Sequence, residues 1–155
     1  MGISLLTAAD WRRAAQEMLD QASRRVRLRE DALSDQNWNN AQLAPALKNF
    51  LLAGPQRRAE FLLSDTRHLY ARCPALLDLL ARFGHLIEIR LQEEEPAPEC
   101  YFLADDKGLL LRPSADNWNA RYAPRDRRAA APWQLHFEAA WERAGAGIPA
   151  RPLGL

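Results

Sequence analysis

Arginine side chains at the ends of predicted strands are the residues in this sequence best suited to chemistry. Arg27 and Arg29 alternate with apolar residues in one short run, and Arg112 closes another, followed by Ser114 and Asn117. Guanidinium groups match the geometry of phosphate and carboxylate oxygens. Because ligands of open α/β sheets bind beyond the carboxyl ends of the strands, these residues predict an anion-binding crevice.

Internal pairing is the competing interpretation of the arginines. The 155-residue chain carries 21 basic and 20 acidic residues, a formal net charge of +1. This balance favours ion pairs and excludes a strongly polybasic nucleic-acid binder. The acidic residues available for pairing with Arg112, Arg121, Arg125, Arg127 and Arg128 include Glu93, Glu94, Glu95, Glu99, Asp105 and Asp106.

The same tripeptide occurs twice, as Asn37-Trp38-Asn39 and as Asn117-Trp118-Asn119. Indole faces and carboxamides suit a polar ligand with a flat or sugar-like part. Coincidence is the simpler explanation, since chains of this length repeat some tripeptides by chance. The hypothesis of a ligand site adds Asn37, Trp38, Asn117 and Trp118 to the arginines.

The sequence contains no recognisable catalytic or metal-binding motif. His68, His85 and His136 lack metal-ligand spacing, and neither Cys73 nor Cys100 belongs to a C-x-x-C pair. There is no G-x-S-x-G elbow and no glycine-rich phosphate loop. We therefore expect no catalytic residue, no metal and no cofactor.

Hydrophobic periodicity predicts helices alternating with strands. The apolar stripe of the first helix begins after a Thr7 cap, and alternating residues indicate strands at 25–30 and 86–91. An Asp/Gly turn between two β-type runs predicts a hairpin over 100–112. The expected fold is an α/β domain: a mixed, mostly parallel sheet with helices on both faces. The remaining predicted elements are helices at 43–54, 74–83 and 132–144 and a strand at 59–63.

Chain length predicts one domain over residues 1–144, followed by a loose tail at 145–155. Residues 113–131 are expected to form a long polar loop. No apolar run approaches the roughly 18 residues that span a bilayer. The two cysteines are too few for a disulfide framework, and no signal peptide is recognisable. We therefore expect a cytoplasmic protein without membrane contact.

The hairpin resembles the core of the phospholipase-D-like superfamily, whose motif is H-x-K-x-x-x-x-D. The run Pro98 to Asp105 has this spacing and keeps the final acid, but Pro98 replaces the histidine and Cys100 replaces the lysine. The run Leu111 to Asn117 resembles the strand-end motif of that superfamily, with Ser114 as a polar residue. The resemblance implies a phospholipase-D-like single half with a degenerate site.

The whole chain also resembles an uncharacterised bacterial family whose members often lie C-terminal to a GNAT-type acyltransferase domain. The resemblance rests on residues 14–29, 104–116 and 137–143. It implies a homodimer, since relatives with a single motif commonly pair across the site. It also implies an acyltransferase-type protein partner and a phosphate-bearing small-molecule ligand.

These observations predict a non-catalytic binding or accessory domain. Without a nucleophile at 98 and a cation at 100, phosphodiester cleavage by the superfamily's mechanism is not available. One alternative is an enzyme of unassigned class that uses Asp105, Asp116 or Ser114. Another, which the charge balance disfavours, is a nucleic-acid-binding module with Trp38, Trp118 and Tyr122 as stacking platforms.

Overall fold

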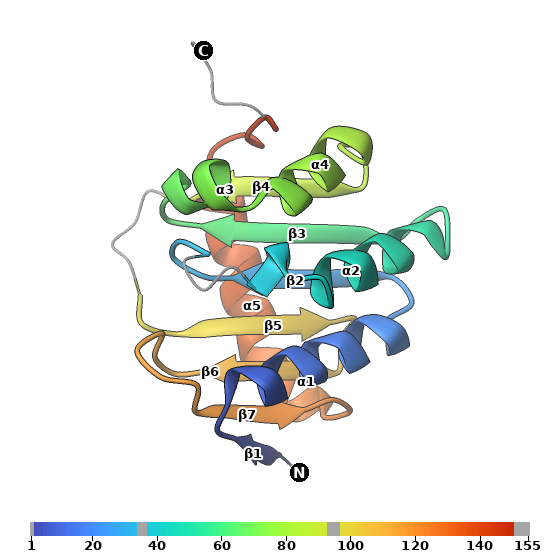
Figure 1. Cartoon of the computed structure of the whole chain (residues 1–155). Coiled ribbons are helices and arrows are strands. Elements are labelled where there is room, and N and C mark those ends of the chain that lie inside the picture. Colours follow the sequence, from blue (N-terminus) through green and yellow to red (C-terminus); the bar gives the residue numbers. More distant parts are fainter. Residues whose placement is uncertain (1, 34–36, 93–96, 151–155) are drawn as a thin grey trace.

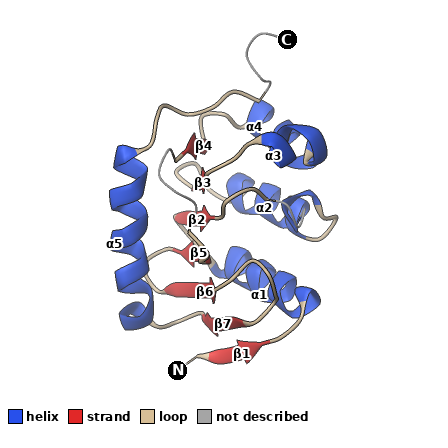
Figure 2. Ribbon diagram, turned by 90° about the vertical axis from the view of Figure 1, so that its left-hand side faces the viewer, coloured by secondary structure: helices blue, strands red, loops and turns tan. Residues whose placement is uncertain are grey.

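A single mixed sheet divides the molecule into two helical layers (Figures 1 and 2). The computed structural model describes residues 2–33, 37–92 and 97–150. Helices α1 to α4 cover one face and α5 covers the other, as predicted for helices on both faces. In chain order the elements are β1 (Ile3–Leu5), α1 (Ala8–Gln21), β2 (Arg25–Arg29), a 3-10 turn (Asn37–Asn39), α2 (Leu43–Leu52), β3 (Arg58–Leu63), α3 (Arg67–Arg72), α4 (Pro74–Arg82), β4 (Ile87–Leu91), β5 (Cys100–Ala104), β6 (Gly108–Arg112), β7 (Ala120–Ala123) and α5 (Arg127–Arg143).

The strand order is β1-β7-β6-β5-β2-β3-β4. Strands β2, β3 and β4 are parallel to one another, whereas β5, β6, β7 and β1 join by antiparallel pairing. The mixed α/β class is confirmed. Parallel pairing is confined to β2, β3 and β4, which are connected through helices, whereas short connections return the chain antiparallel from β5 to β6 and from β6 to β7.

Local sequence explains the first helix well. The Thr7 hydroxyl caps α1 by accepting the Asp10 N–H at 3.1 Å, and Trp11, Ala15 and Met18 are buried. The predicted hairpin is present as β5 and β6, with Asp105 at a positive φ of 51° in the turn. These elements confirm the helical and strand periodicities.

Residues 113–131 are not one long loop, and this prediction is wrong. They contain β7, which pairs with β6 and with β1, and the first turn of α5. The Asp126 carboxylate caps that helix by accepting the Ala129 N–H at 3.0 Å, so Pro132 lies inside the helix and not at its start. Strand β7 has only four residues, too few for alternation to be recognised.

The chain after α5 returns to the far edge of the sheet. The Ile148 N–H donates to the Ile89 carbonyl at 2.8 Å, and the Tyr70 hydroxyl donates to the Pro149 carbonyl at 2.7 Å. The prediction of a loose tail at 145–155 did not include these two hydrogen bonds. Residues 151–155 lie outside the described residues, and the domain division at 144 stays a prediction.

The sheet separates two hydrophobic clusters. The larger lies under α1 to α4 and includes Trp11, Trp38 and Phe61. The smaller lies under α5 and includes Tyr101 and Phe137. Within the described ranges, no helix has both the length and the apolar character needed to cross a bilayer.

Candidate functional site

Arg27 lies in the middle of the sheet beneath α5. Its side chain is nearly buried because β2 is a central strand covered on both faces. The guanidinium donates to Glu60 at 2.9 Å and to Gln134 at 2.7 Å, and it contacts Glu138 at 3.2 Å. It also lies 5.1 Å from the Phe137 ring centre. Arg27 of β2 therefore links its own strand to the neighbouring strand β3 and to α5.

Arg29 holds the segment that leads into β5. Only 1% of the residue is exposed. One terminal nitrogen donates to the Ala97 and Glu99 carbonyls at 3.3 and 3.1 Å, and the other pairs with Asp31 at 2.8 Å. An incoming anion would have to displace these backbone and carboxylate oxygens.

Arg112 has a comparable role on the opposite face of the sheet, towards α1. Its guanidinium donates to the Asn117 and Ala115 carbonyls, each at 2.8 Å. It also lies 3.9 Å from the centre of the Trp118 ring. The residue is 3% exposed, so its charge is turned inward and stabilises the loop before β7.

Ser114 and Asn117 make local turn contacts within that same loop. The Ser114 hydroxyl accepts the Asp116 N–H at 3.2 Å, and the Asn117 side chain accepts the Asn119 N–H at 2.9 Å. Asn117 is exposed. The predicted strand-end motif is thus present as a structured turn, whose ligand role stays a prediction.

The two Asn-Trp-Asn tripeptides meet around one residue. Trp11 of α1 lies 6.4 Å from Trp38 and 6.2 Å from Trp118, both in edge-on contact. Trp38 is 1% exposed and also packs on Phe61 and Phe102. Its indole cannot meet a surface ligand unless the core opens, whereas Trp118 is half-buried at the rim.

The asparagines of the first tripeptide support the same packing. Asn37 is buried and accepts a hydrogen bond from Arg12 at 3.4 Å, and Asn39 accepts the Ala75 N–H of α4 at 2.9 Å. The first tripeptide therefore packs the 3-10 turn against α1 and α4. Sequence reasoning did not identify Trp11 as the link, because it lies on a regular helical stripe.

The three positions of the degenerate motif lie before, in and after β5. Pro98 is exposed just before the strand, and the Cys100 thiol is buried beside Arg112, its register partner in β6. Burial raises the pKa of Cys100 to about 12, and the negative charge of Glu30 acts in the same direction. The Cys100 thiol is therefore protonated at neutral pH.

Glu30 and Gln92 are further buried polar residues, and neither was a candidate in the sequence analysis.

Asp105, the acid retained from the motif, lies at the other end of β5. Its carboxylate accepts backbone N–H groups of Ser23, Arg24 and Arg25 at 3.0, 2.9 and 3.1 Å. Burial acts to raise the pKa of Asp105, but these donors outweigh it and hold the pKa below its usual range. Asp105 therefore fixes the turn between α1 and β2.

An open groove of about 370 Å³ lies at this same end of the sheet, away from the predicted crevice. None of the eight residues selected from the sequence lines it; four of those are Arg27, Arg29, Arg112 and Trp118. Apart from Asp105, the motif acid, no motif marks this groove in the sequence, because its residues come from turns, from the first residues of two strands and from α5. It is lined by Arg24, Arg25, Gln56, Arg58, Asp105, Asp106, Gln134 and Glu138.

The pairing hypothesis holds for several arginines, although the partners differ from those expected. Arg127 pairs with Asp106 at 3.0 Å, as the sequence suggested, whereas Arg27 and Arg29 use Glu60 and Asp31. The residues Glu93, Glu94 and Glu95 lie outside the described residues. In the part of the chain that the structure describes, no group of three His, Cys, Asp or Glu side chains could hold a metal ion.

Comparison with solved structures shows a phospholipase-D-like fold. Nuc, a phospholipase D family member from Salmonella typhimurium, superposes with a TM-score of 0.68 at 14% identity, covering 96% of this chain and 99% of Nuc. NucT from Helicobacter pylori gives 0.62 at 10% identity, with 96% and 99% coverage. TrmBL2, an archaeal chromatin protein described as having a novel mode of DNA binding, gives 0.67 at 16% identity.

The TrmBL2 match covers 94% of this chain but only 54% of TrmBL2, so this chain spans about half of that protein. A comparison with curated protein sequences finds no match. Residues 7–153 match the family described as a domain of unknown function, DUF7931. With nearly its whole length matched, the chain belongs to the DUF7931 family and has the fold of phospholipase D family members.

Proposed function

We propose that this chain is a non-catalytic binding or accessory domain built on a phospholipase-D-like fold. The observation that carries the proposal is the state of Cys100 and Arg112 at the degenerate motif. The thiol is buried, with a pKa of about 12, and the guanidinium is bound to two backbone carbonyls. Neither group is in a state to attack or to bind a phosphodiester.

The histidines do not replace the missing nucleophile. His136 is on α5, where its Nδ1 lies 2.7 Å from the Tyr101 hydroxyl. Tyr101 points to the face of the sheet opposite Cys100, since successive residues of a strand alternate. His68 belongs to α3 and His85 follows α4. Tyr101 and His136 are within hydrogen-bond reach of each other, as nucleophilic catalysis requires, but burial raises the pKa of the Tyr101 hydroxyl above its usual range and opposes its activation.

An enzyme that uses Asp105 as its acid receives little support from the same geometry. A general acid needs a raised pKa, whereas backbone donors lower the pKa of Asp105. Asp116 and Ser114 lie in the turn after β6, where the Ser114 hydroxyl bonds the Asp116 backbone. These contacts support a structural role for all three residues.

The proposal extends to what the domain binds. We propose that the domain binds an anionic or phosphate-bearing small molecule. We also propose that it forms a homodimer and binds an acyltransferase-type protein. A cytoplasmic location and a bacterial source belong to the same proposal. Light scattering of the purified chain tests the dimer directly, and a strict monomer at high concentration would remove it.

The central experiment is a turnover assay with bis(4-nitrophenyl) phosphate on the purified full chain. We expect no release of nitrophenol above the buffer rate for the wild type or for Cys100→Ser. Turnover that co-purifies with the chain and falls in Cys100→Ser or Glu30→Gln would overturn the non-catalytic proposal. The Arg82→Gln variant, on the outer side of α4, serves as the matched control.

Nucleic-acid binding is a second candidate, favoured by the fold similarity to the archaeal chromatin protein. The stacking version of this hypothesis is not supported, because Trp38 and Tyr122 are buried. Binding would have to rest on exposed arginines and therefore weaken steeply with salt. A gel-shift titration at two salt concentrations tests it, and the absence of any shift would exclude it.

A further inference from the structure

The open groove at the hairpin end of the sheet contains an unusual pair of like charges. Arg25 and Arg58 are the first residues of β2 and β3 and are direct register partners in the parallel pair. Register partners in neighbouring strands point to the same face, so the two guanidinium groups share the face covered by α5. Like charges placed in this way repel each other unless an anion lies between them.

Arg24 and Arg25 have no side-chain hydrogen bond or ion pair with any other residue that the structure describes. Their bonds are made by the backbone: Asp105 accepts from both N–H groups, and their carbonyls accept from the N–H groups of Arg58 and Asp105. Arg58 has one distant contact, with Glu88 at 3.8 Å. This contrasts with Arg27, only two residues further along β2, whose guanidinium contacts three side chains.

The carboxylates of the groove already have partners. Three backbone N–H groups bind Asp105, Arg127 pairs with Asp106 at 3.0 Å, and Arg27 contacts Glu138 at 3.2 Å. Arg27 is shared between Glu138 and Glu60. Within the described residues, the groove therefore presents the Arg24 and Arg25 guanidinium groups without a hydrogen-bonded partner, beside acids that already have one. Burial, followed by the charge of Arg27, lowers the pKa of Arg25, whereas the carboxylates of Glu60 and Glu138 act in the opposite direction.

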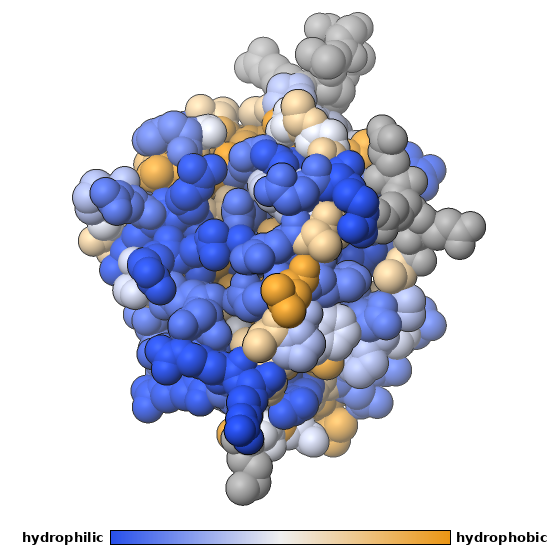
Figure 3. Space-filling view, turned by 180° about the vertical axis from the view of Figure 1, so that it is seen from behind, coloured by the Kyte–Doolittle hydropathy of each residue, from blue (hydrophilic) through white to orange (hydrophobic). Residues whose placement is uncertain are grey.

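The other polar groups of the groove define the rest of the ligand. Gln134 is fixed by its bonds to the Asp105 carbonyl at 2.6 Å and to Arg27 at 2.7 Å, and forms a rigid wall. Gln56 is exposed and also lines the groove. The face that carries α5 is hydrophilic over most of its area (Figure 3). These features suit a ligand whose part outside the anionic group is polar and not apolar.

We propose that this groove binds a phosphate ester of mononucleotide size, with the phosphate on Arg24, Arg25 and Arg58. Its volume of about 370 Å³ is in the range of small-molecule sites. Guanidinium forks bind phosphate oxygens in a bidentate manner, and Gln56 faces the sugar or base. The inference rests on the proposed binding function for its ligand class, but it places the ligand at the opposite end of β2 from the predicted crevice.

Calorimetric titration of the full chain with adenosine 5′-monophosphate, ribose 5-phosphate and adenosine tests the proposal. We expect both phosphates to bind and adenosine to bind at least about tenfold more weakly, because the charged hydrogen bonds supply the affinity. The variant Arg25→Gln/Arg58→Gln should lower the affinity for the phosphates by about tenfold or more. Arg24→Gln, in a more exposed position, repeats the test without altering the sheet.

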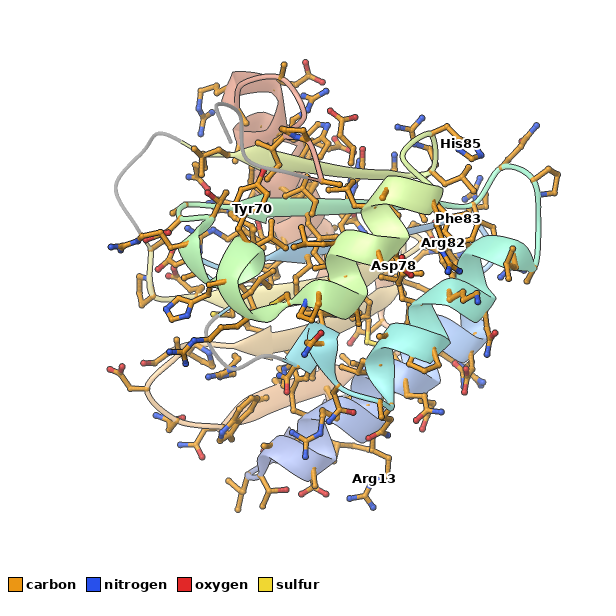
Figure 4. All side chains as sticks on the ribbon, turned by 45° about the horizontal axis from the view of Figure 1, so that its top comes forward. Arg13, Tyr70, Asp78, Arg82, Phe83 and His85 are labelled. Atoms are coloured by element: carbon orange, nitrogen blue, oxygen red, sulfur yellow. The ribbon has the colours of Figure 1, made fainter. Side chains whose placement is uncertain are left out.

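The matched controls are Arg13→Gln and Arg82→Gln, whose side chains lie on the outer sides of α1 and α4 (Figure 4). Both should bind the phosphates as the wild type does. The proposal would be overturned if neither phosphate bound the wild type, or if the affinity for the phosphates were unchanged in Arg25→Gln/Arg58→Gln. Circular dichroism confirms that each variant is folded.

Two further outcomes separate this inference from the proposed function. Binding that is lost in Ser114→Ala/Asn117→Ala and retained in the groove variants would place the ligand in the predicted crevice, overturning the groove while leaving the binding function intact. Tighter binding of single-stranded DNA than of the mononucleotide, with a steep salt dependence, would replace the small-molecule ligand by nucleic acid.

Discussion

The guanidinium of Arg112 lies 3.9 Å from the centre of the Trp118 ring. The same group donates to the carbonyls of Ala115 and Asn117, so one side chain at the end of β6 determines the path of the chain towards β7. Trp118 in turn contacts Trp11 of α1. A residue that looks like an anion ligand in the sequence therefore connects the sheet, a loop and a helix.

Arg112→Lys should destabilise the fold although it keeps the charge. A lysine ammonium cannot bond two carbonyls in the planar arrangement of guanidinium and stack on Trp118 at the same time. We expect the free energy of unfolding to fall by about 2–3 kcal/mol, measured by urea denaturation. The control Arg82→Gln, which removes an exposed pair with Asp78, should change it by less than about 1 kcal/mol. Equal effects of the two changes would contradict this role for Arg112.

Asp105→Asn should lower stability in a pH-dependent manner. Backbone donors hold the pKa of Asp105 below its usual range in the folded chain, so its ionised form contributes stability above the unfolded pKa of about 3.9. That contribution is lost as the pH falls through the folded pKa. We expect a difference from wild type of about 1–2 kcal/mol at pH 7, shrinking in acid. Urea titrations from neutral to acidic pH measure it.

The control for that series is Asp116→Asn, an exposed acid in the turn after β6. Its stability should follow that of the wild type at every pH. A constant difference between Asp105→Asn and wild type down to the lowest pH would show that the Asp105 charge does not matter.

Both thiols should be unreactive in the folded chain. Cys73 and Cys100 are buried and do not form a disulfide, and burial raises the pKa of Cys100 to about 12, so the reactive thiolate of Cys100 is scarce at pH 8. Ellman's reagent should label neither cysteine in native buffer and both in guanidinium chloride. Rapid native labelling that disappears in Cys100→Ser would show that the thiol is accessible and would weaken the non-catalytic proposal.

Trp38→Ala should cost about twice as much stability as Trp118→Ala. Trp38 packs inside the core against Phe61 and Phe102, and removing a buried aromatic ring costs about 3–5 kcal/mol. Trp118 lies at the rim, and we expect roughly half of that loss. Thermal or urea unfolding of the two variants makes the comparison. Similar small losses would instead fit two surface platforms for a ligand.

The periodic elements of the fold could be predicted because neighbouring residues determine them. The stripe of Trp11, Ala15 and Met18 specifies the buried face of α1, and the Asp/Gly turn specifies the hairpin. The replacement of a nucleophile by Pro98 is likewise visible in the sequence. Strands β1 and β7 were missed, because strands of three and four residues are too short to establish a period.

The surroundings of the arginines depended on tertiary structure. Alternation correctly assigns Arg25, Arg27 and Arg29 to one face of β2, but it does not reveal that α5 covers that face. Burial beneath a helix makes Arg27 a structural ion pair, whereas Arg25, at the open end of the same strand, remains in a groove. Its position beside Arg58 arises only when β2 and β3 pair. The sequence by itself determined which residues alternate and which chemistry is missing; the pairing of distant strands decided which charges meet, because electrostatic contacts depend on distance in space and not along the chain.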